Sequence, residues 1–163
     1  GGIVLSRLIP VGGNRFDEAI INKIKKDMNF VIGEKSAEAI KKNIASAYAT
    51  DAQMDICGRN LVTGLPSEIT VTGECVHEAL AELFQSIVDS IKIILERTPP
   101  EISSDIYKSG LYLTGGSSRI QDLGQFIYDE LGLKVNLCEE PESTVIMGLG
   151  AVIEDPQLAK LAL

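Results

Sequence analysis

Apolar residues recur at helical spacing along much of the chain, and at alternate positions or in short runs elsewhere. Spacings of three and four residues predict helices, whereas alternation and short β-branched runs predict strands. Helices are expected over about 14–29, 36–48, 74–97, 101–108, 120–131 and 143–154. Strands are expected over 3–9, 111–114 and 133–138, with two more in a hairpin or meander within 51–72. This order predicts an α/β domain with a small α+β insertion.

Capping residues set the expected helix ends. Asn14, Ser36 and Thr72 are predicted N-caps, because their side-chain oxygens can accept from the free N–H groups of a first turn. Gly110 is expected just past the end of the 101–108 helix. The sequence therefore predicts where most of the helices begin or end.

Burial is also predicted from the pattern. The apolar stripe of the 74–97 helix is too wide for a surface helix, so this helix is expected to pack against a sheet. The 3–9 run is apolar on both alternating faces, which suits a strand covered on both sides. Gly148 and Gly150 lie inside a predicted helix and each costs about 1 kcal/mol relative to alanine, so close packing against a sheet or ligand is expected there.

The stretch 111–120 combines a predicted strand, the pair Gly115 and Gly116, and the start of a predicted helix. Ligands of open α/β sheets bind beyond the carboxyl ends of the strands, and glycine lets backbone approach a flat ring closely. A plain βα turn is the equally weighted alternative. Gly12 and Gly13, which precede the first helix, have the same two interpretations: a turn, or a loop facing a phosphate.

Glu38 lies three and four residues before Lys41 and Lys42 on one predicted helix. Spacing alone favours a solvated face of ion pairs over a binding site.

Composition narrows the class of protein. The 163 residues are 45% hydrophobic and 23% charged, as in an ordinary globular domain. A formal charge of −8 makes nucleic-acid binding unfavourable. Three cysteines without a C-x-x-C pair and a single histidine indicate neither a disulfide framework nor a zinc site, and a reducing cytosol fits. Because the chain starts Gly-Gly-Ile without a methionine, it is expected to be a fragment.

The motifs together are more specific than any one of them. Residues 113–120 (LTGGSSRI), with Pro141 and the later Gly-Leu-Gly, resemble the adenosine motif of the actin, heat-shock-70 and sugar-kinase ATPase superfamily. Within it, residues 9–20, 97–101 and the string GRNLVTGLP at 58–66 resemble the MreB/Mbl family of bacterial actins. The family usually has aspartate in place of Asn60. A heat-shock-70 chaperone or a sugar kinase is the alternative.

The resemblance implies a fold and a set of site residues. The fold would be domain II of an actin-like (ribonuclease H-like) ATPase, with residues 1–28 and 73–163 as an incomplete subdomain IIA and 29–72 as subdomain IIB. Gly115, Gly116 and Ser117 would lie along the adenosine, and Glu38 and Lys41 would reach the ribose and adenine. The remaining expected neighbours are, for the base, Lys42, Arg119 and Glu142, and, for the phosphates, Gly12, Gly13 and Asn14.

The resemblance also implies what the chain would lack. The first phosphate loop, and a second one in a hairpin before residue 1, are expected to lie outside it, leaving no catalytic residue and no metal ligand. The full-length parent would bind ATP with Mg²⁺ and act as an ATPase, whereas this chain would bind nucleotide weakly or not at all and hydrolyse none. Without that hairpin, the 3–9 segment would lose its neighbour in the sheet and would pair with another chain or be displaced.

The parent would form filaments at the inner face of the cell membrane, with a RodZ-type partner and the cell-wall elongation machinery, and direct rod shape. Its membrane contacts would lie outside this chain.

Overall fold

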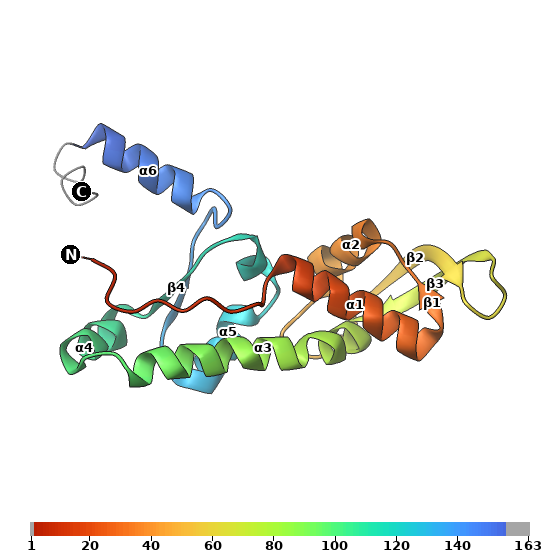
Figure 1. Ribbon diagram of the computed structural model, residues 1–163, viewed down its shortest axis with the longest axis horizontal. Helices are drawn as coiled ribbons and strands as arrows, with labels where there is room; N and C mark the ends of the chain where they lie inside the picture. Colours follow the sequence, from red (N-terminus) through yellow and green to blue (C-terminus); the bar gives the residue numbers. More distant parts are fainter. Residues whose placement is uncertain (1, 156–163) are drawn as a thin grey trace.

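The computed structural model describes residues 2–155. It forms an elongated molecule with one long helix along its length (Figure 1). The elements in chain order are α1 (Gly13–Met28), β1 (Phe30–Val31), α2 (Glu34–Ile44), β2 (Gln53–Asn60), β3 (Pro66–Thr72), α3 (Gly73–Glu96), α4 (Pro100–Ser109), β4 (Leu111–Leu113), the 3₁₀ turn η1 (Gly116–Arg119), α5 (Leu123–Leu131), β5 (Val135–Leu137) and α6 (Thr144–Glu154).

The predicted hairpin within 51–72 is present. Strand β2 pairs with β3 in antiparallel register and with the two-residue strand β1 on its other side. Asn60 Oδ1 closes the turn by accepting from the N–H groups of Val62 and Thr63 at 2.8 and 3.1 Å. The prediction differs in one respect: β2 continues through Gly58 to Asn60, so part of the expected connection is strand.

Helices α1, α2 and α3 enclose most of the core with this sheet. The side chains of Phe16 and Phe84 are at most 1% exposed, and their ring centroids lie 5.6 Å apart. Helix α3 was expected to pack against a sheet, and it does meet β3, but its main partner is α1, and it also packs against α5 and α2. Its wide apolar stripe is therefore covered largely by other helices.

A parallel pair of strands, β4 and β5, is connected through α5. The predicted 120–131 helix begins three residues late, at Leu123. Ile120 is extended at ψ 129 and Asp122 is left-handed at φ 59, and neither conformation continues a helix. The glycine turn therefore leads first into η1 and only then into α5.

The predicted helix ends are only partly correct. Thr72 caps α3 by accepting from the Cys75 N–H at 3.3 Å, and Gly110 ends α4. Asn14 and Ser36 do not serve as N-caps, because Gly12 and Gly33 stand before the first turns of α1 and α2. Helix α2 also ends earlier than predicted, at Ile44.

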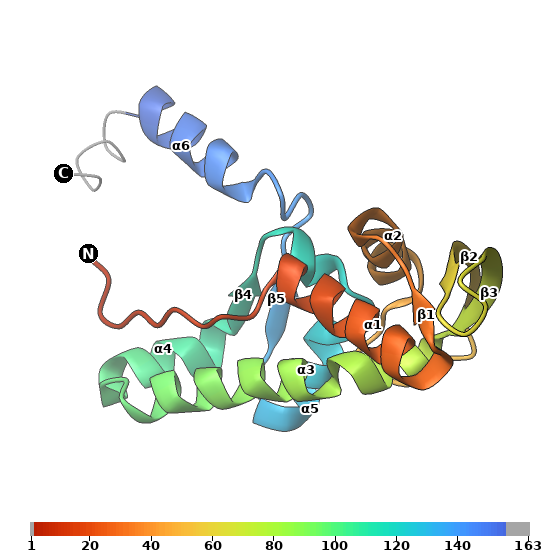
Figure 2. The ribbon, with the colours of Figure 1, turned by 45° about the vertical axis from the view of Figure 1, so that its right-hand side comes forward.

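Two expectations of burial are wrong. The 3–9 segment is almost entirely exposed and belongs to no strand, so the strand predicted from its apolar pattern is wrong, whereas the displacement that the resemblance implied for it is present. Within residues 2–155 the strand β4 pairs only with β5. Helix α6 extends away from the rest of the molecule (Figure 2), and no other element of the described residues comes within 4 Å of a Cβ built on Gly148 or Gly150. The apolar pattern predicted partners that these segments do not meet in the described part of the chain.

Candidate functional site

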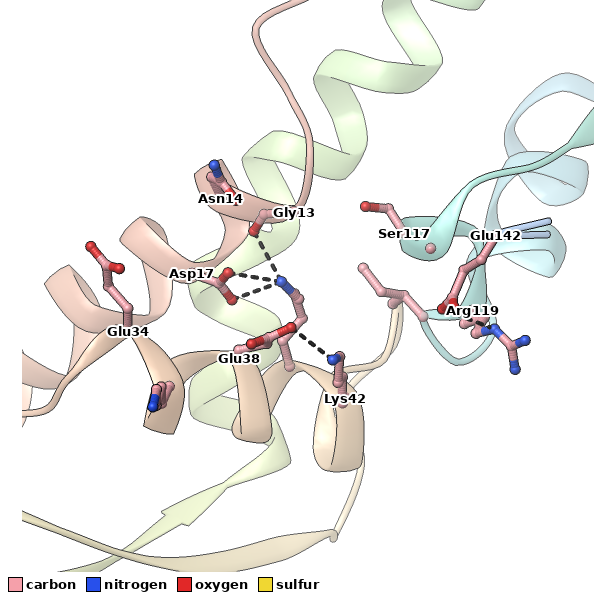
Figure 3. A pocket seen from close by; sticks show the side chains of 13 residues that line it. Gly13, Asn14, Asp17, Glu34, Glu38, Lys42, Ser117, Arg119 and Glu142 are labelled. Carbon is pink, nitrogen blue, oxygen red and sulfur yellow. Dashed lines mark hydrogen bonds and ion pairs between the residues drawn. The ribbon is translucent and has the colours of Figure 1, made fainter. Parts of the chain in front are cut away.

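A cleft of about 980 Å³ opens where the start of α1, the exposed face of α2 and the η1 turn converge (Figure 3). It brings together residues that are widely separated in the sequence. They are Gly13, Asn14, Asp17, Glu34, Lys35, Glu38, Lys41, Lys42, Gly116, Ser117, Arg119, Ile120 and Glu142.

Lys41 joins two walls of the cleft. Its Nζ lies 2.8 Å from each carboxylate oxygen of Asp17 and donates to the Gly13 carbonyl at 3.1 Å. The Lys41 and Asp17 side chains are only 12% and 15% exposed, so water screens this pair weakly. Lys41 thus fixes α2 against the first turn of α1, and its ammonium is already engaged by protein oxygens.

Glu38 and Lys42 form a separate, solvated ion pair at 2.7 Å. The hydrogen bond from Lys42 lowers the pKa of Glu38, and the same bond raises the pKa of Lys42, with a smaller contribution from Glu142. The ion-pair face that the spacing favoured is therefore present for Glu38 and Lys42, while Lys41 turns to α1.

The glycine turn is fixed through its backbone. Gly115 has φ +86 and ψ 159, a conformation that suits glycine and is disfavoured for other residues. Its N–H donates to the carbonyl oxygen of Pro141 at 2.7 Å, and the Thr114 hydroxyl donates to the same oxygen at 2.9 Å. These bonds hold the 139–142 turn, and with it Glu142, beside Gly116.

The start of α1 faces this turn across the cleft. A Cβ built on Gly13 would lie 3.5 Å from Lys41 Nζ and 3.9 Å from the Ser117 hydroxyl oxygen. The first turn of α1 contains no acidic residue and its N-cap, Gly12, offers no side-chain acceptor. The N–H groups of this turn and the positive end of the helix dipole are thus available to an anion.

Most of the site residues predicted from sequence line this one cleft. Gly13, Asn14, Glu38, Lys41, Lys42, Gly116, Ser117, Arg119 and Glu142 do so. Gly12 and Gly115 do not line it; each directly precedes a residue that does.

Sequence reasoning missed four lining residues: Asp17, Glu34, Lys35 and Ile120. Asp17 could have been found, because it lies four residues after Gly13 and therefore on the same face of α1.

A second set of contacts, outside the cleft, holds the segment that follows α2 against the residues that follow the glycine turn. The Ala47 N–H donates to the Gln121 carbonyl at 2.9 Å, and the hydroxyl of Ser46, which is 1% exposed, donates to Asp122 at 3.2 Å. We call residues 45–48 with 121–122 the seam. Beside it, the Tyr48 hydroxyl donates to Asp129, and this hydrogen bond raises the pKa of Tyr48 to about 12.

Within residues 2–155, no group of histidine, cysteine, aspartate or glutamate side chains is arranged to hold a metal ion. Nor is any helix of the described chain both long and apolar enough to cross a membrane.

The arrangement of these elements is that of the actin-like fold. The MreB5 structure of Spiroplasma citri bound to ADP superimposes with a TM-score of 0.89 at 36% identity, covering 93% of this chain and 47% of that one. The MamK double helical filament matches at a TM-score of 0.68 and 24% identity, over 80% of this chain and 41% of that chain, which supports the fold alone.

The chain belongs to the MreB/Mbl family, whose model, described as MreB/Mbl protein, matches residues 1–161. It is 39% identical over 155 residues to the cell shape-determining protein MreB of Escherichia coli K12, covering 94% of this chain and 45% of that protein. It is 40% identical over 157 residues to the cell shape-determining protein Mbl of Bacillus subtilis 168, covering 95% and 47%. The chain thus spans about half the length of these curated relatives. Membership favours a bacterial actin over the chaperone and sugar-kinase alternatives.

Proposed function

We propose that this chain is domain II of a bacterial actin and supplies the nucleoside side of an ATP site. The cleft is the observation that carries the proposal, since it joins Gly116, the start of α1 and the polar face of α2. A solved relative, MreB5, is described as bound to ADP and to AMPPNP. The division into subdomain IIA (1–28 and 73–163) and subdomain IIB (29–72) is part of the same proposal.

The residues take distinct parts in this proposal. The adenosine lies against Gly116 and Ser117, where a missing Cβ leaves room for a flat ring. Glu38 borders the ribose, and the first-turn N–H groups of α1 at Gly13 and Asn14 face the phosphates. Lys41 acts by holding α1 and α2 in register, because its ammonium is bound to Asp17 and Gly13.

The cleft does not suit a triphosphate with Mg²⁺ on its own. Three of the four cations that line the cleft, Lys41, Lys42 and Arg119, are each paired with a carboxylate, so turning any of them to a phosphate breaks a pair. Lys35 is the one lining cation without such a pair among the described residues. The carboxylates Asp17, Glu38 and Glu142 are engaged by the same cations, and we assign none of them to the metal. We therefore expect weak binding by this chain and no hydrolysis; Mg²⁺ and ATPase activity belong to the longer parent.

The parent is proposed to form cytoplasmic filaments that determine cell shape. Relatives of this chain are named cell shape-determining proteins, and MamK, which shares the fold, is described as a double helical filament. Attachment at the inner face of the membrane, a RodZ-type partner and the elongation machinery are the finer parts of this proposal.

An ADP titration followed by backbone amide NMR tests the site. We expect millimolar binding, with shifts concentrated at Gly13, Asn14 and residues 116–120. The variant Gly116→Val places a branched side chain where the ring is to lie, and should abolish these shifts. Its Cβ would meet Glu142 at 3.6 Å, an ordinary contact, and the amide spectrum recorded without ADP shows whether the variant keeps the fold. Gly148→Ala, in open space on α6, is the matched control.

Shifts that Gly116→Val leaves unchanged, or shifts remote from the cleft, would contradict the proposed site. Sub-micromolar ATP affinity in calorimetry, or steady turnover by the pure chain, would contradict the proposed weakness and inactivity.

A further inference from the structure

A second hollow, of about 450 Å³, lies outside the cleft, between helix α5 and strand β5. Most of the residues that line it are apolar: Leu123 is buried, whereas Leu137 and Tyr128 are 59% and 48% exposed. Helix and strand approach each other closely at Gly124, because a Cβ built there would lie 3.5 Å from side-chain atoms of Val135 and Leu137. We call this hollow the α5–β5 groove. Its apolar surface is open to solvent in the described part of the chain.

The open edge of β5 lies along this groove. The Lys134 carbonyl accepts from the Leu111 N–H at 2.8 Å, so the backbone of Lys134 faces β4. Successive residues of a strand direct their backbone groups to opposite sides. Val135 and Leu137, which both line the groove, therefore direct their N–H and C=O groups away from β4. Within residues 2–155 no other strand pairs with β5, so this edge is a template for an added strand.

Two charged residues line the groove, and they differ in whether a partner engages them. The Asp122 carboxylate accepts from the Ser46 hydroxyl at 3.2 Å. The Lys134 ammonium has no hydrogen bond or ion pair with any residue that the structure describes. An ammonium can only donate, and a carboxylate can only accept. The charge that remains to be matched in the groove is therefore positive, and it suits a carboxylate.

We propose that the α5–β5 groove binds an extended peptide segment of a partner protein, which adds a strand to β5 and carries a carboxylate that pairs with Lys134. In strand addition, main-chain hydrogen bonds give affinity and pockets for alternate side chains give specificity. Every second residue of the peptide points into the groove, so an apolar residue packs against Leu137 and Tyr128, and an acidic residue two positions away lies on the same face. This inference does not depend on the nucleotide site.

Three synthetic peptides test this docking by amide NMR titration of the 163-residue chain. The first, acetylated and amidated, has the sequence SVTLTD, in which valine, leucine and aspartate share one face of a strand. The second has asparagine in place of aspartate, and should bind about threefold more weakly, as for an exposed ion pair. The third carries N-methyl groups on its two central residues, which block both edges of the peptide, and should bind about tenfold more weakly than the first.

Protein variants then assign the contacts to residues. Lys134→Gln removes the ammonium and should bring the first two peptides to equal affinity. Lys108→Gln removes an exposed ammonium on α4, outside the groove, and should keep the preference for aspartate. Leu137→Ala shortens a largely exposed side chain and should weaken the first peptide about tenfold. The amide spectrum of each variant without peptide shows whether it keeps the fold.

Each outcome supports or overturns the inference. Shifts at Val135 and Leu137, weak binding of the N-methylated peptide and a preference for aspartate that Lys134→Gln removes would support it. If the N-methylated peptide binds as tightly as the first, strand addition is wrong. If Lys134→Gln keeps the preference for aspartate, the pairing with Lys134 is wrong. If no groove amide shifts at millimolar peptide, the groove is not a docking site for such a segment.

Discussion

The two ends of α3 lie in different surroundings. The part of it up to Val88 contributes Val76, Leu80, Phe84 and Val88 to the core, each at most 1% exposed, where α1, α2 and the antiparallel sheet close around it. Its last turns, around Ile91 and Leu95, are only half-buried. The packed end thus supports α1 and α2, whose residues line the cleft.

The other end of the molecule carries apolar side chains that the described residues do not cover. Ile3 and Leu8 are 87% and 98% exposed, and Ile146 on α6 is 71% exposed. These segments have the apolar pattern of core elements. The difference shows that an apolar stripe identifies a surface that can be buried, but does not identify the segment that covers it.

Truncating a core side chain should show the difference between the packed end and the exposed end of the molecule most strongly. Phe84→Ala removes a fully buried ring that packs on Phe16 and Phe126, and should lower the free energy of unfolding by about 3–5 kcal/mol. Ile146→Ala on α6 should change it by less than about 0.5 kcal/mol. Chemical denaturation measures both. A similar loss in the two variants would mean that α6 packs as tightly as α3.

Breaking the ion pair between Lys41 and Asp17 should have the next largest effect on the free energy of unfolding. Lys41→Met leaves the largely buried Asp17 carboxylate and the Gly13 carbonyl without their donor, and should cost about 2 kcal/mol. Lys42→Met breaks only the solvated pair with Glu38 and should stay within about 0.5 kcal/mol. Equal effects in denaturant titrations would remove the distinction between the two lysines.

Breaking the seam should lower the free energy of unfolding less than breaking the Lys41 pair, but its effect should extend to the cleft. Ser46→Ala removes a buried hydroxyl and leaves Asp122 without that donor, at a cost of about 1 kcal/mol. It should also weaken ADP binding, because the seam holds α2 and the η1 turn together. Thr70→Val breaks an exposed hydrogen bond to Asp55 in the hairpin and is the control for binding. Unchanged ADP affinity in Ser46→Ala would show that the seam does not set the cleft.

The smallest predicted effect is the pH dependence of the stability that the Tyr48 hydrogen bond contributes. Its pKa is raised from 10 to about 12 by the hydrogen bond to Asp129, so the folded state favours the neutral phenol. The stabilisation is therefore complete below pH 10 and is lost as the pH rises from 10 through 12. An ultraviolet absorbance titration should show a transition near pH 12 that Tyr48→Phe removes. A titration that Tyr48→Phe does not alter would contradict this hydrogen bond.

The local sequence pattern predicted the helices and strands better than it predicted what each of them packs against. The stripe of α3, the hairpin within 51–72 and the Thr72 cap depend on neighbouring residues, which the sequence displays directly. The late start of α5 does not, because it follows from the left-handed Asp122, whose carboxylate accepts from Ser46 far away in the chain.

The residues of the cleft were predicted from the resemblance of motifs, but the ion pairs that they form within it were not predictable from the sequence. Spacing on α2 favoured pairs of Glu38 with either lysine. Only the packing of α2 against α1 decides that Lys41 turns to Asp17 and leaves Lys42 to Glu38. The contact of Glu142 with Gly116 likewise depends on the backbone bonds to Pro141, which join two distant turns.

The central claim is that an adenine nucleotide binds between the η1 turn and α2. Intermolecular nuclear Overhauser effects between the base protons of ADP and the protein test it most directly. The account predicts contacts from the base to Gly116 and Ser117 on one side and to the side chain of Lys42 on the other. Base contacts confined to residues outside this cleft would contradict it.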